Sequence, residues 1–557
     1  MATDLSPRPP MSGPAATAPA AGTTRSPTAV WWRTYRHHLR LLRNTSIAWT
    51  VALAGLGAGV VATFEDRIPT EAARAAADAT EGVPAFEALL GRFVRPGSLE
   101  GFVLSRWTGV FAIAVAVWGM LAATELLRGA DEAGHTEPLR AGALSPRGLL
   151  GAAVTAMLTW FALFGLAVGA SHSAAGMDPA TSWALGGAMG LLAATLAAVG
   201  TLASQVVVTR RRASRLAGTV LAAALAVRVL AAATTTPDWV WWATPFGWIG
   251  FLHETDEART AVFASFAALV ILLFSPAFGL ARRDLHAGIV GGIEPAATQA
   301  RPVGGQLGLT ARIAGTAVAG WAAVLAAAAF VFTVLVDDFV AIWADMDVEA
   351  AVIYEQMGYV ALDTHEGFVA IILGFFFVVG VALFSAAQTA AIREEEASWR
   401  IEHLLARPVG RVRWLVTRTL AAVVGVVVLG VAVGVVVWVA TALGGTAMAF
   451  GDALLAGVNL MPAALLFLGL GILVFGLLPR LTAPLTFGLV IAAYLLDFVG
   501  PLLELPDGLL DVSPFRHLAA VPASDLDIIA ALIMLGSGAL AALIGVAAFR
   551  HRDLKEA

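Results

Sequence analysis

Residues 413–443 read RWLVTRTLAAVVGVVVLGVAVGVVVWVATAL, and the part from 419 to 443 has no charged side chain. Because a helix crosses a bilayer with about 20 mainly apolar residues, this run predicts a membrane-spanning helix, long enough to tilt or break. Eleven further runs meet the same criterion. The twelve predicted spans lie at about 46–64, 104–127, 149–170, 183–209, 216–233, 260–281, 312–336, 367–392, 413–443, 451–478, 482–499 and 527–549.

The composition is that of a chain that lies mostly in lipid. Of the 557 residues, 59% are hydrophobic and 13% are charged, and the mean hydropathy is +0.80; a soluble domain has about 25% charged residues. Cysteine is absent, which excludes disulfides and cysteine-based metal sites. The one lysine is Lys555, so the chain has no P-loop lysine. We therefore predict an all-α polytopic membrane protein that is not an enzyme and holds no metal or cofactor.

Positive charge is divided unequally between the two sides of the predicted membrane. With both termini in the cytoplasm, the cytoplasmic segments hold 27 of the 35 Lys and Arg residues, as the positive-inside rule requires. Arg210, Arg211 and Arg212 share one short turn, whereas residues 337–366 contain eight acidic residues and neither Lys nor Arg. The sequence therefore predicts a multi-pass protein of the bacterial cytoplasmic membrane with both termini inside.

Two segments precede the first predicted span. Residues 1–30 are rich in Pro, Ala, Ser and Thr, which predicts a disordered cytoplasmic tail. Residues 31–44 place four arginines on one helical face and aromatic and leucine side chains on another, a pattern typical of a helix in the headgroup layer; a soluble basic helix is the alternative. Residues 45–290 and 291–557 then form two halves of six spans each.

The two halves match at a nearly constant offset. Shifted by 265, residues 128–141 fall on 393–406, and shifted by 269, Thr244-Pro245-Phe246 falls on Ser513-Pro514-Phe515. Since each half has six spans, the repeats have the same orientation in the membrane. This predicts two parallel six-span repeats with a pathway between them.

A charged segment follows the second span of each half. It is richer in charge than the other inner turns, and a short charged helix there suits contact with a soluble partner; a solvated helix end is the alternative. The candidate coupling residues are Arg128, Asp131, Glu132 and Glu137 in the first copy, and Arg393, Glu394, Glu395, Glu396, Arg400 and Glu402 in the second.

Other candidates lie within or beside the spans. Arg228 and Asp497 occupy equivalent positions of the repeat, which suggests an ion pair at an outer gate; side chains that reach to the interface are the alternative. Between the fifth and sixth spans, residues 245–248 and 501–515 predict short interfacial or re-entrant helices. Aromatic side chains could line the pathway or face lipid: Trp118, Phe375, Phe376, Phe377 and Tyr494.

The charged loops and proline motifs resemble a known family. Residues 393–409, 478–480, 497–501 and 513–515 are similar to the permeases of type-two ABC exporters, and more closely to the fused twelve-span actinobacterial permeases of polyketide-antibiotic (tetronasin-resistance-like) exporters. The resemblance covers essentially the whole chain beyond the tail. It implies that residues 128–147 and 393–413 hold coupling helices, which dock two copies of a nucleotide-binding ATPase subunit that binds ATP and magnesium. The first copy departs from the acidic pattern, with Gly129-Ala130 where the second has Glu394-Glu395.

These observations favour the membrane permease subunit of an ATP-driven exporter of hydrophobic or amphipathic compounds, such as drugs or polyketide antibiotics. An exporter of lipids and a transporter driven by an ion gradient are the alternatives. Gradient-driven carriers usually hold carboxylates in mid-span, and the predicted span centres contain essentially none. Asp345, Asp347 and Glu349 alternate in an outer loop, which we interpret as an acidic lip and not a metal site.

Overall fold

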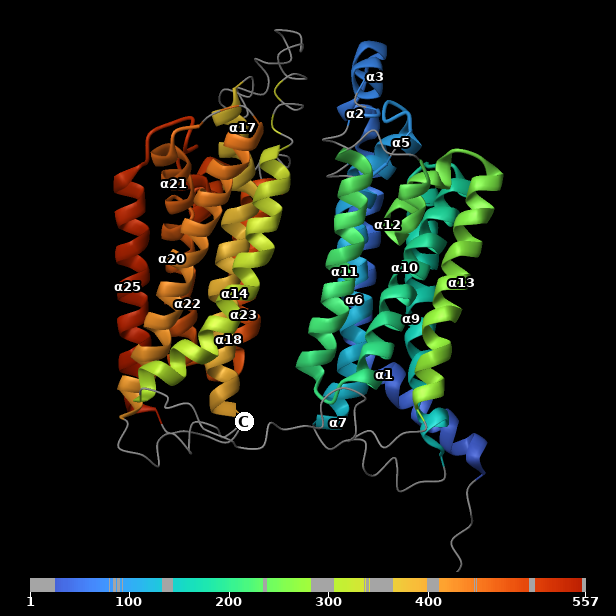
Figure 1. The fold of residues 1–557 in the computed structure, drawn as a ribbon, viewed down its shortest axis with the longest axis horizontal. Coiled ribbons are helices and arrows are strands. Elements are labelled where there is room, and N and C mark those ends of the chain that lie inside the picture. Colours follow the sequence, from blue (N-terminus) through green and yellow to red (C-terminus); the bar gives the residue numbers. More distant parts are fainter. Residues whose placement is uncertain are drawn as a thin grey trace, which may run out of the picture. The chain divides into compact units, whose positions relative to one another are not determined.

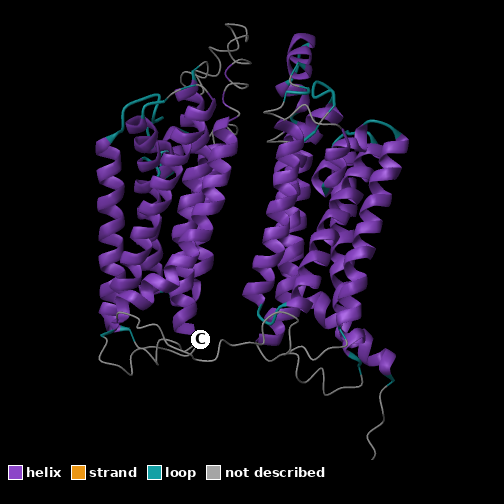
Figure 2. Cartoon of the chain, in the orientation of Figure 1, coloured by secondary structure: helices purple, strands orange, loops and turns teal. Residues whose placement is uncertain are grey.

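The apolar runs of the chain form helices, and the part of the chain that the structure describes contains no β-strand (Figure 2). This computed structural model describes residues 26–79, 81–83, 87, 91, 92, 94–132, 144–233, 238–281, 305–334, 336, 340, 364–397, 410–444, 446, 448–499 and 506–552. Within these residues, twelve helices are long and apolar enough to cross a membrane. The predicted all-α polytopic fold is therefore confirmed, as are the twelve predicted spans.

The chain forms two compact units, Met1–Gly82 with Leu90–Glu294, and Val83–Leu89 with Pro295–Ala557. The helices of each unit run side by side (Figure 1). The first unit contains α1 (Pro27–Ala62), α2 (Phe64–Arg67), α3 (Glu71–Asp78), α5 (Leu99–Val103), η1 (Leu104–Thr108), α6 (Gly109–Thr124), η2 (Glu125–Gly129), α7 (Ala130–Glu132), α9 (Pro146–Ala174), α10 (Pro179–Val206), α11 (Arg210–Ala233), η3 (Asp238–Ala243), α12 (Pro245–Trp248), η4 (Ile249–His253) and α13 (Asp256–Leu280).

The second unit repeats this pattern of six long helices with short helices between them. It contains α14 (Gly305–Val334), α17 (His365–Ile372), η5 (Leu373–Phe377), α18 (Val378–Ala397), α20 (Arg411–Gly444), α21 (Phe450–Val458), α22 (Met461–Leu477), η6 (Pro479–Leu481), α23 (Thr482–Val499), α24 (Asp507–Leu510), η8 (Pro514–His517) and α25 (Ile528–His551).

Local sequence explains where several spans begin. Ser145 and Asp178 each stand before a proline, and their side chains accept hydrogen bonds from the backbone N–H groups of Gly148 and Thr181. Proline is suited to the first helical position because it has no N–H to leave unpaired, and Ser or Asp at the N-cap satisfies one of the remaining donors. The N-cap residue and the proline after it thus set the start of α9 and of α10.

The fourth span forms the core of each unit, and glycine allows its neighbours to approach closely. In the first unit α10 packs against α6, α9, α11 and α13, and in the second α22 packs against α18, α23 and α25. A Cβ added to Gly469 of α22 would lie 2.0 Å from the carbonyl oxygen of Gly538 in α25. Such contacts replace the hydrophobic driving force, which is weak between helices in lipid.

Three details differ from or refine the sequence prediction. The helix expected at 31–44 is continuous with the first span, since both belong to α1. In this part of α1, the Tyr35 hydroxyl lies 3.1 Å from the hydroxyl of Thr159 in α9. The long run at 413–443 forms the single helix α20 without a break. Short helices do occur at the predicted interfacial segments, as α12 in the first unit and as α24 and η8 in the second.

Candidate functional site

We define the charged end of each unit as the end at which its second span finishes, at α7 in the first unit and at the C-terminus of α18 in the second. In the first unit, Arg128 is only 3% exposed. Its Nε donates to the carbonyl oxygen of Ser204 at 2.6 Å, and its guanidinium lies 3.7 Å from Asp131. An arginine at the last carbonyls of α10 satisfies groups that the helix leaves unpaired. Arg128 therefore fastens the second span to the core helix.

The same end of the first unit is also fastened to the start of α11. Arg210 forms an ion pair with Glu125, and its backbone N–H donates to the carboxylate of Glu132 at 2.8 Å. A carboxylate at a helix N-terminus is favoured by the helix dipole. Glu132, one of the predicted coupling residues, thus caps α11, whereas Arg210 and Glu125 were not predicted to act here.

In the second unit the charged end is tied to the last span. The Glu396 side chain, 6% exposed, pairs with Arg393 at 3.1 Å and with Arg552 at the end of α25. Arg552 also donates to the carbonyl oxygen of Phe475 at 3.2 Å, and its guanidinium lies 5.1 Å from the ring centre of Phe475 and 5.4 Å from that of Phe549. We call Arg393, Glu396 and Arg552 the α25 clamp.

A second ion pair joins the same helix to α20. Glu395 forms an ion pair with Arg418, which is 8% exposed. Glu394, by contrast, is an exposed residue. Of the predicted coupling residues, Glu395 and Glu396 are therefore engaged inside the unit, and Glu394 is on its surface. Glu137, Arg400 and Glu402 lie outside the described residues.

The three predicted phenylalanines of the eighth span lie in η5, a π-helical segment, and point in different directions. Phe375 packs against Tyr494 of α23, with ring centres 5.4 Å apart. Phe376, 42% exposed, stacks on Phe332 of α14 at 5.5 Å, and Phe377 meets Phe332 edge-on at 6.0 Å. The structure thus brings four of the five predicted aromatic residues into one group, in which Phe375 also meets Phe376. Phe332, which contacts Phe376 and Phe377, was not singled out by the sequence.

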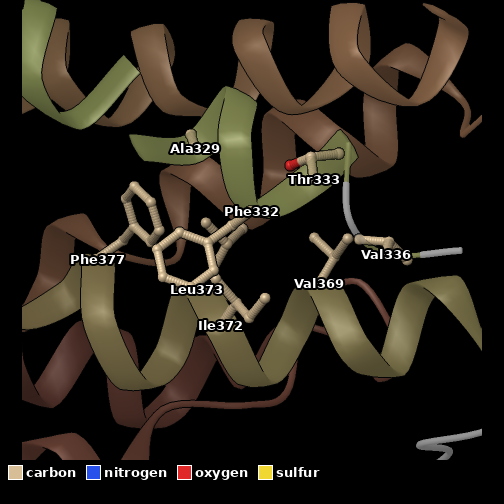
Figure 3. Close-up of a pocket in the computed structure, with 8 residues that line it drawn as sticks. All are labelled: Ala329, Phe332, Thr333, Val336, Val369, Ile372, Leu373 and Phe377. Atoms are coloured by element: carbon tan, nitrogen blue, oxygen red, sulfur yellow. The ribbon is translucent and has the colours of Figure 1, made fainter. Parts of the chain in front are cut away.

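Beside this aromatic group lies a shallow apolar hollow. Figure 3 shows Phe332 and Phe377 next to each other at one end of it and Val336 and Val369 at the other. Among its eight lining residues the Thr333 hydroxyl is the single polar side-chain group. The surface suits contact with an apolar molecule.

The fifth predicted aromatic residue, Trp118, is in the core of the first unit. It is 3% exposed and packs against Trp49, Phe161 and Phe164 with ring centres 5.0 to 6.2 Å away. Such a cluster stabilises the packing of α1, α6 and α9. Little of its side chain is left to line a pathway.

Arg228 and Asp497 belong to different units, so their pairing stays a prediction. Arg228 is 4% exposed and lies in the last turns of α11. It lines a hollow with Thr108 of η1. Asp497 is half-buried at the corresponding end of α23.

Comparison with known proteins is consistent with this architecture. The family described as "Multidrug efflux system permease Rv1217c, C-terminal domain" matches the chain twice, over residues 33–281 and 303–550. The chain is also 28% identical over 535 residues to the multidrug efflux system permease protein Rv1217c of Mycobacterium tuberculosis. This alignment covers 93% of the chain and 94% of the relative. Since the two matches together span most of the sequence, the chain belongs to this family of multidrug efflux permeases.

Proposed function

We propose that the chain is the membrane permease subunit of an ATP-driven exporter that moves hydrophobic or amphipathic drug-like compounds out of the cell. Two copies of a separate nucleotide-binding ATPase, which carry ATP and magnesium, dock at the charged ends. The observation that carries this proposal is the pair of charged ends, because each lies after the second span and is fastened to its unit by ion pairs. A rigidly fastened helix end transmits the movement of a bound partner to the spans.

We further propose that the two units are copies of one six-span repeat with the same orientation. Three observations support this. The family matches the chain twice. The π-helical segments η1 and η5 begin at Leu104 and Leu373, 269 residues apart. Both charged ends contain an i,i+3 pair of arginine and acid, Arg128–Asp131 and Arg393–Glu396. Both termini then lie on the same side of the membrane, which we assign to the cytoplasm from the distribution of positive charge.

The relative's description as a multidrug efflux permease and the apolar hollow at η5 support drug-like compounds as the substrate class. The aromatic and aliphatic lining favours apolar molecules without requiring one particular shape. An exporter of this kind takes its substrate from the membrane or the cytoplasm and releases it outside.

Reconstitution tests the proposal directly. Proteoliposomes that contain the permease and its ATPase partner should accumulate a fluorescent hydrophobic drug when ATP and magnesium are added without any ion gradient. Proteoliposomes with the permease alone should not transport when a proton or sodium gradient is imposed. Uptake by the isolated permease under a gradient would contradict ATP drive and would support a secondary transporter.

A further inference from the structure

The end of the first unit opposite its charged end contains a hollow that the proposed export mechanism does not use. It is shallow and open to its surroundings, with room for about one water-sized group. Thr108 from η1, Arg228 from α11 and Gly250 from η4 line it, together with Arg92. Among the described residues that line it, the charged ones are both arginines.

The polar groups in this hollow are hydrogen-bond donors. Arg228 is 4% exposed and Thr108 is 6% exposed, and the Thr108 hydroxyl forms no hydrogen bond with any described residue. Arg92 is held in place by Glu254 at 2.8 Å and by the ring of Phe251. A buried hydroxyl without a partner is costly, and an acceptor that enters the hollow offsets that cost.

Glycine leaves the space in front of the buried guanidinium open. Gly91 has a φ of +91°, and a Cβ at this position would lie 3.8 Å from Nη1 of Arg228. Any larger side chain here would extend toward the guanidinium and fill the hollow. Gly91 thus leaves room for a small polar group beside Nη1 of Arg228, whose side chain also interacts within the chain.

The corresponding place in the second unit has a different chemistry. There, Leu373 and Phe377 of η5 hold the positions of Leu104 and Thr108, and Asp497 of α23 holds that of Arg228. An aromatic side chain is therefore compatible with this position of a π-helical segment. The threonine and the arginines give the hollow in the first unit a preference for an anion, whereas a phenylalanine and a carboxylate at the equivalent positions of the second unit do not.

The depth of the hollow identifies the kind of anion. Arg228 is the nineteenth residue of α11, about 27 Å from the start of the helix at 1.5 Å per residue, so it lies near the far surface of the bilayer. The neighbouring η3 and α12 carry Trp241, Trp242 and Trp248, residues typical of the headgroup layer. A ligand that reaches this depth from lipid has its charged head here and its apolar part in the membrane.

We propose that this hollow binds the oxyanion head of an amphiphile, with Arg228 and Thr108 as its ligand-binding residues. The head group is a phosphodiester of a lipid or a carboxylate of an amphipathic compound, since both present the same acceptor oxygens. The site does not depend on ATP-driven export, and it can be tested with the permease alone.

The test is a binding titration of the detergent-purified full-length protein by native mass spectrometry. The probes are dioleoylphosphatidylglycerol, oleate, orthophosphate and the uncharged dioleoylglycerol. One of the two anionic amphiphiles should bind saturably, and Arg228→Gln should weaken that binding roughly tenfold to a hundredfold, as expected for one lost charge-assisted hydrogen bond. Arg74→Gln, which removes a charge from α3 at the same end of the unit (Figure 1), should leave it unchanged.

Thr108→Val gives a second, independent measurement. It should weaken binding severalfold and also raise the melting temperature of the ligand-free protein, because it removes a buried hydroxyl that has no partner. A preference for phosphatidylglycerol identifies a lipid headgroup, and a preference for oleate identifies a carboxylate amphiphile. Equal binding of dioleoylglycerol, binding of orthophosphate alone, or anion binding that survives Thr108→Val and, in a folded variant, Arg228→Gln would overturn the proposal.

Discussion

Thr244 and Ser513 form the same hydrogen bonds at positions 269 residues apart. The Thr244 hydroxyl donates to the carbonyl oxygen of Ala224 at 3.0 Å, and the Ser513 hydroxyl donates to that of Ala493 at 2.9 Å. Each hydroxyl also accepts from the backbone N–H two residues further on. Both side chains are fully buried. In each unit, one hydroxyl therefore joins the short helix after the fifth span to the span itself.

This arrangement predicts equal effects in the two units. Thr244→Val and Ser513→Ala should each lower the free energy of unfolding by about 1–2 kcal/mol, because each removes a buried donor and an N-cap acceptor. Thr244→Ser keeps the hydroxyl and serves as the matched control. The measurement is unfolding of the detergent-solubilised protein followed by circular dichroism. Loss of stability in one unit only would mean that the two bonds are not equivalent.

The α25 clamp predicts that neighbouring acidic residues differ in their roles. Glu396→Ala should destabilise the permease by about 3–5 kcal/mol, because it leaves two arginines in a poorly hydrated site without their carboxylate. Glu394→Ala, at an exposed position of the same helix turn, should leave the melting temperature nearly unchanged. The comparison needs only a thermal melt of each variant. Equal melting temperatures for the two variants would contradict the clamp.

The same pair of variants separates folding from coupling. If the ATPase docks at the charged end, Glu394→Ala should reduce drug-stimulated ATP hydrolysis in the reconstituted complex while the permease stays folded. A lost charged contact across such an interface is worth about 2–5 kcal/mol when it is desolvated. Full stimulation in this variant would remove Glu394 from the docking surface.

The sequence predicts the membrane spans well and the side-chain contacts between spans poorly, for a physical reason. Apolar length and charge distribution are local properties, so the run at 413–443 was sufficient to predict α20. The i,i+3 relation of Arg393 and Glu396 is also local. By contrast, Arg552 reaches Glu396 across 156 residues, and no spacing rule connects them. An arginine near the end of the last span indicates which side of the membrane that end faces, but it does not indicate the partner of the arginine.

The π-helical segments illustrate the same limit at the candidate site. Phe375, Phe376 and Phe377 were recognisable as an aromatic run, yet their division between Tyr494 and Phe332 depends on the local backbone. Apolar length and charge spacing do not distinguish a π-helical turn from an α-helical one. For that reason the sequence did not predict a role for Phe332, which lies beside η5, or for Thr108, which lies within η1.

The hollow at η5 predicts which aromatic residue affects transport. Phe332→Ala should raise the concentration of hydrophobic drug needed for half-maximal ATPase stimulation severalfold, because an aromatic contact is worth about 0.5–1.5 kcal/mol beyond the area it buries. Phe330→Ala, on the same helix and 40% exposed, is the control and should have no effect on this concentration. Identical drug dependence in the two variants would show that the hollow does not contact substrate.

The absence of cysteine allows the proposed orientation to be tested one position at a time. Asp66 and Arg211 are both exposed residues of the first unit, located at its two opposite ends. Cysteines at these positions are therefore comparable in access to water, so a difference in labelling reports the side of the membrane.

In intact cells, a membrane-impermeant maleimide should label Asp66→Cys and should label Arg211→Cys only after the membrane is opened. The positive-inside rule requires this result, because the turn that contains Arg211 also contains Arg210, Arg212 and Arg215. Labelling of Arg211→Cys from outside would invert the topology and place the charged ends, with their proposed ATPase contacts, on the side where ATP is absent.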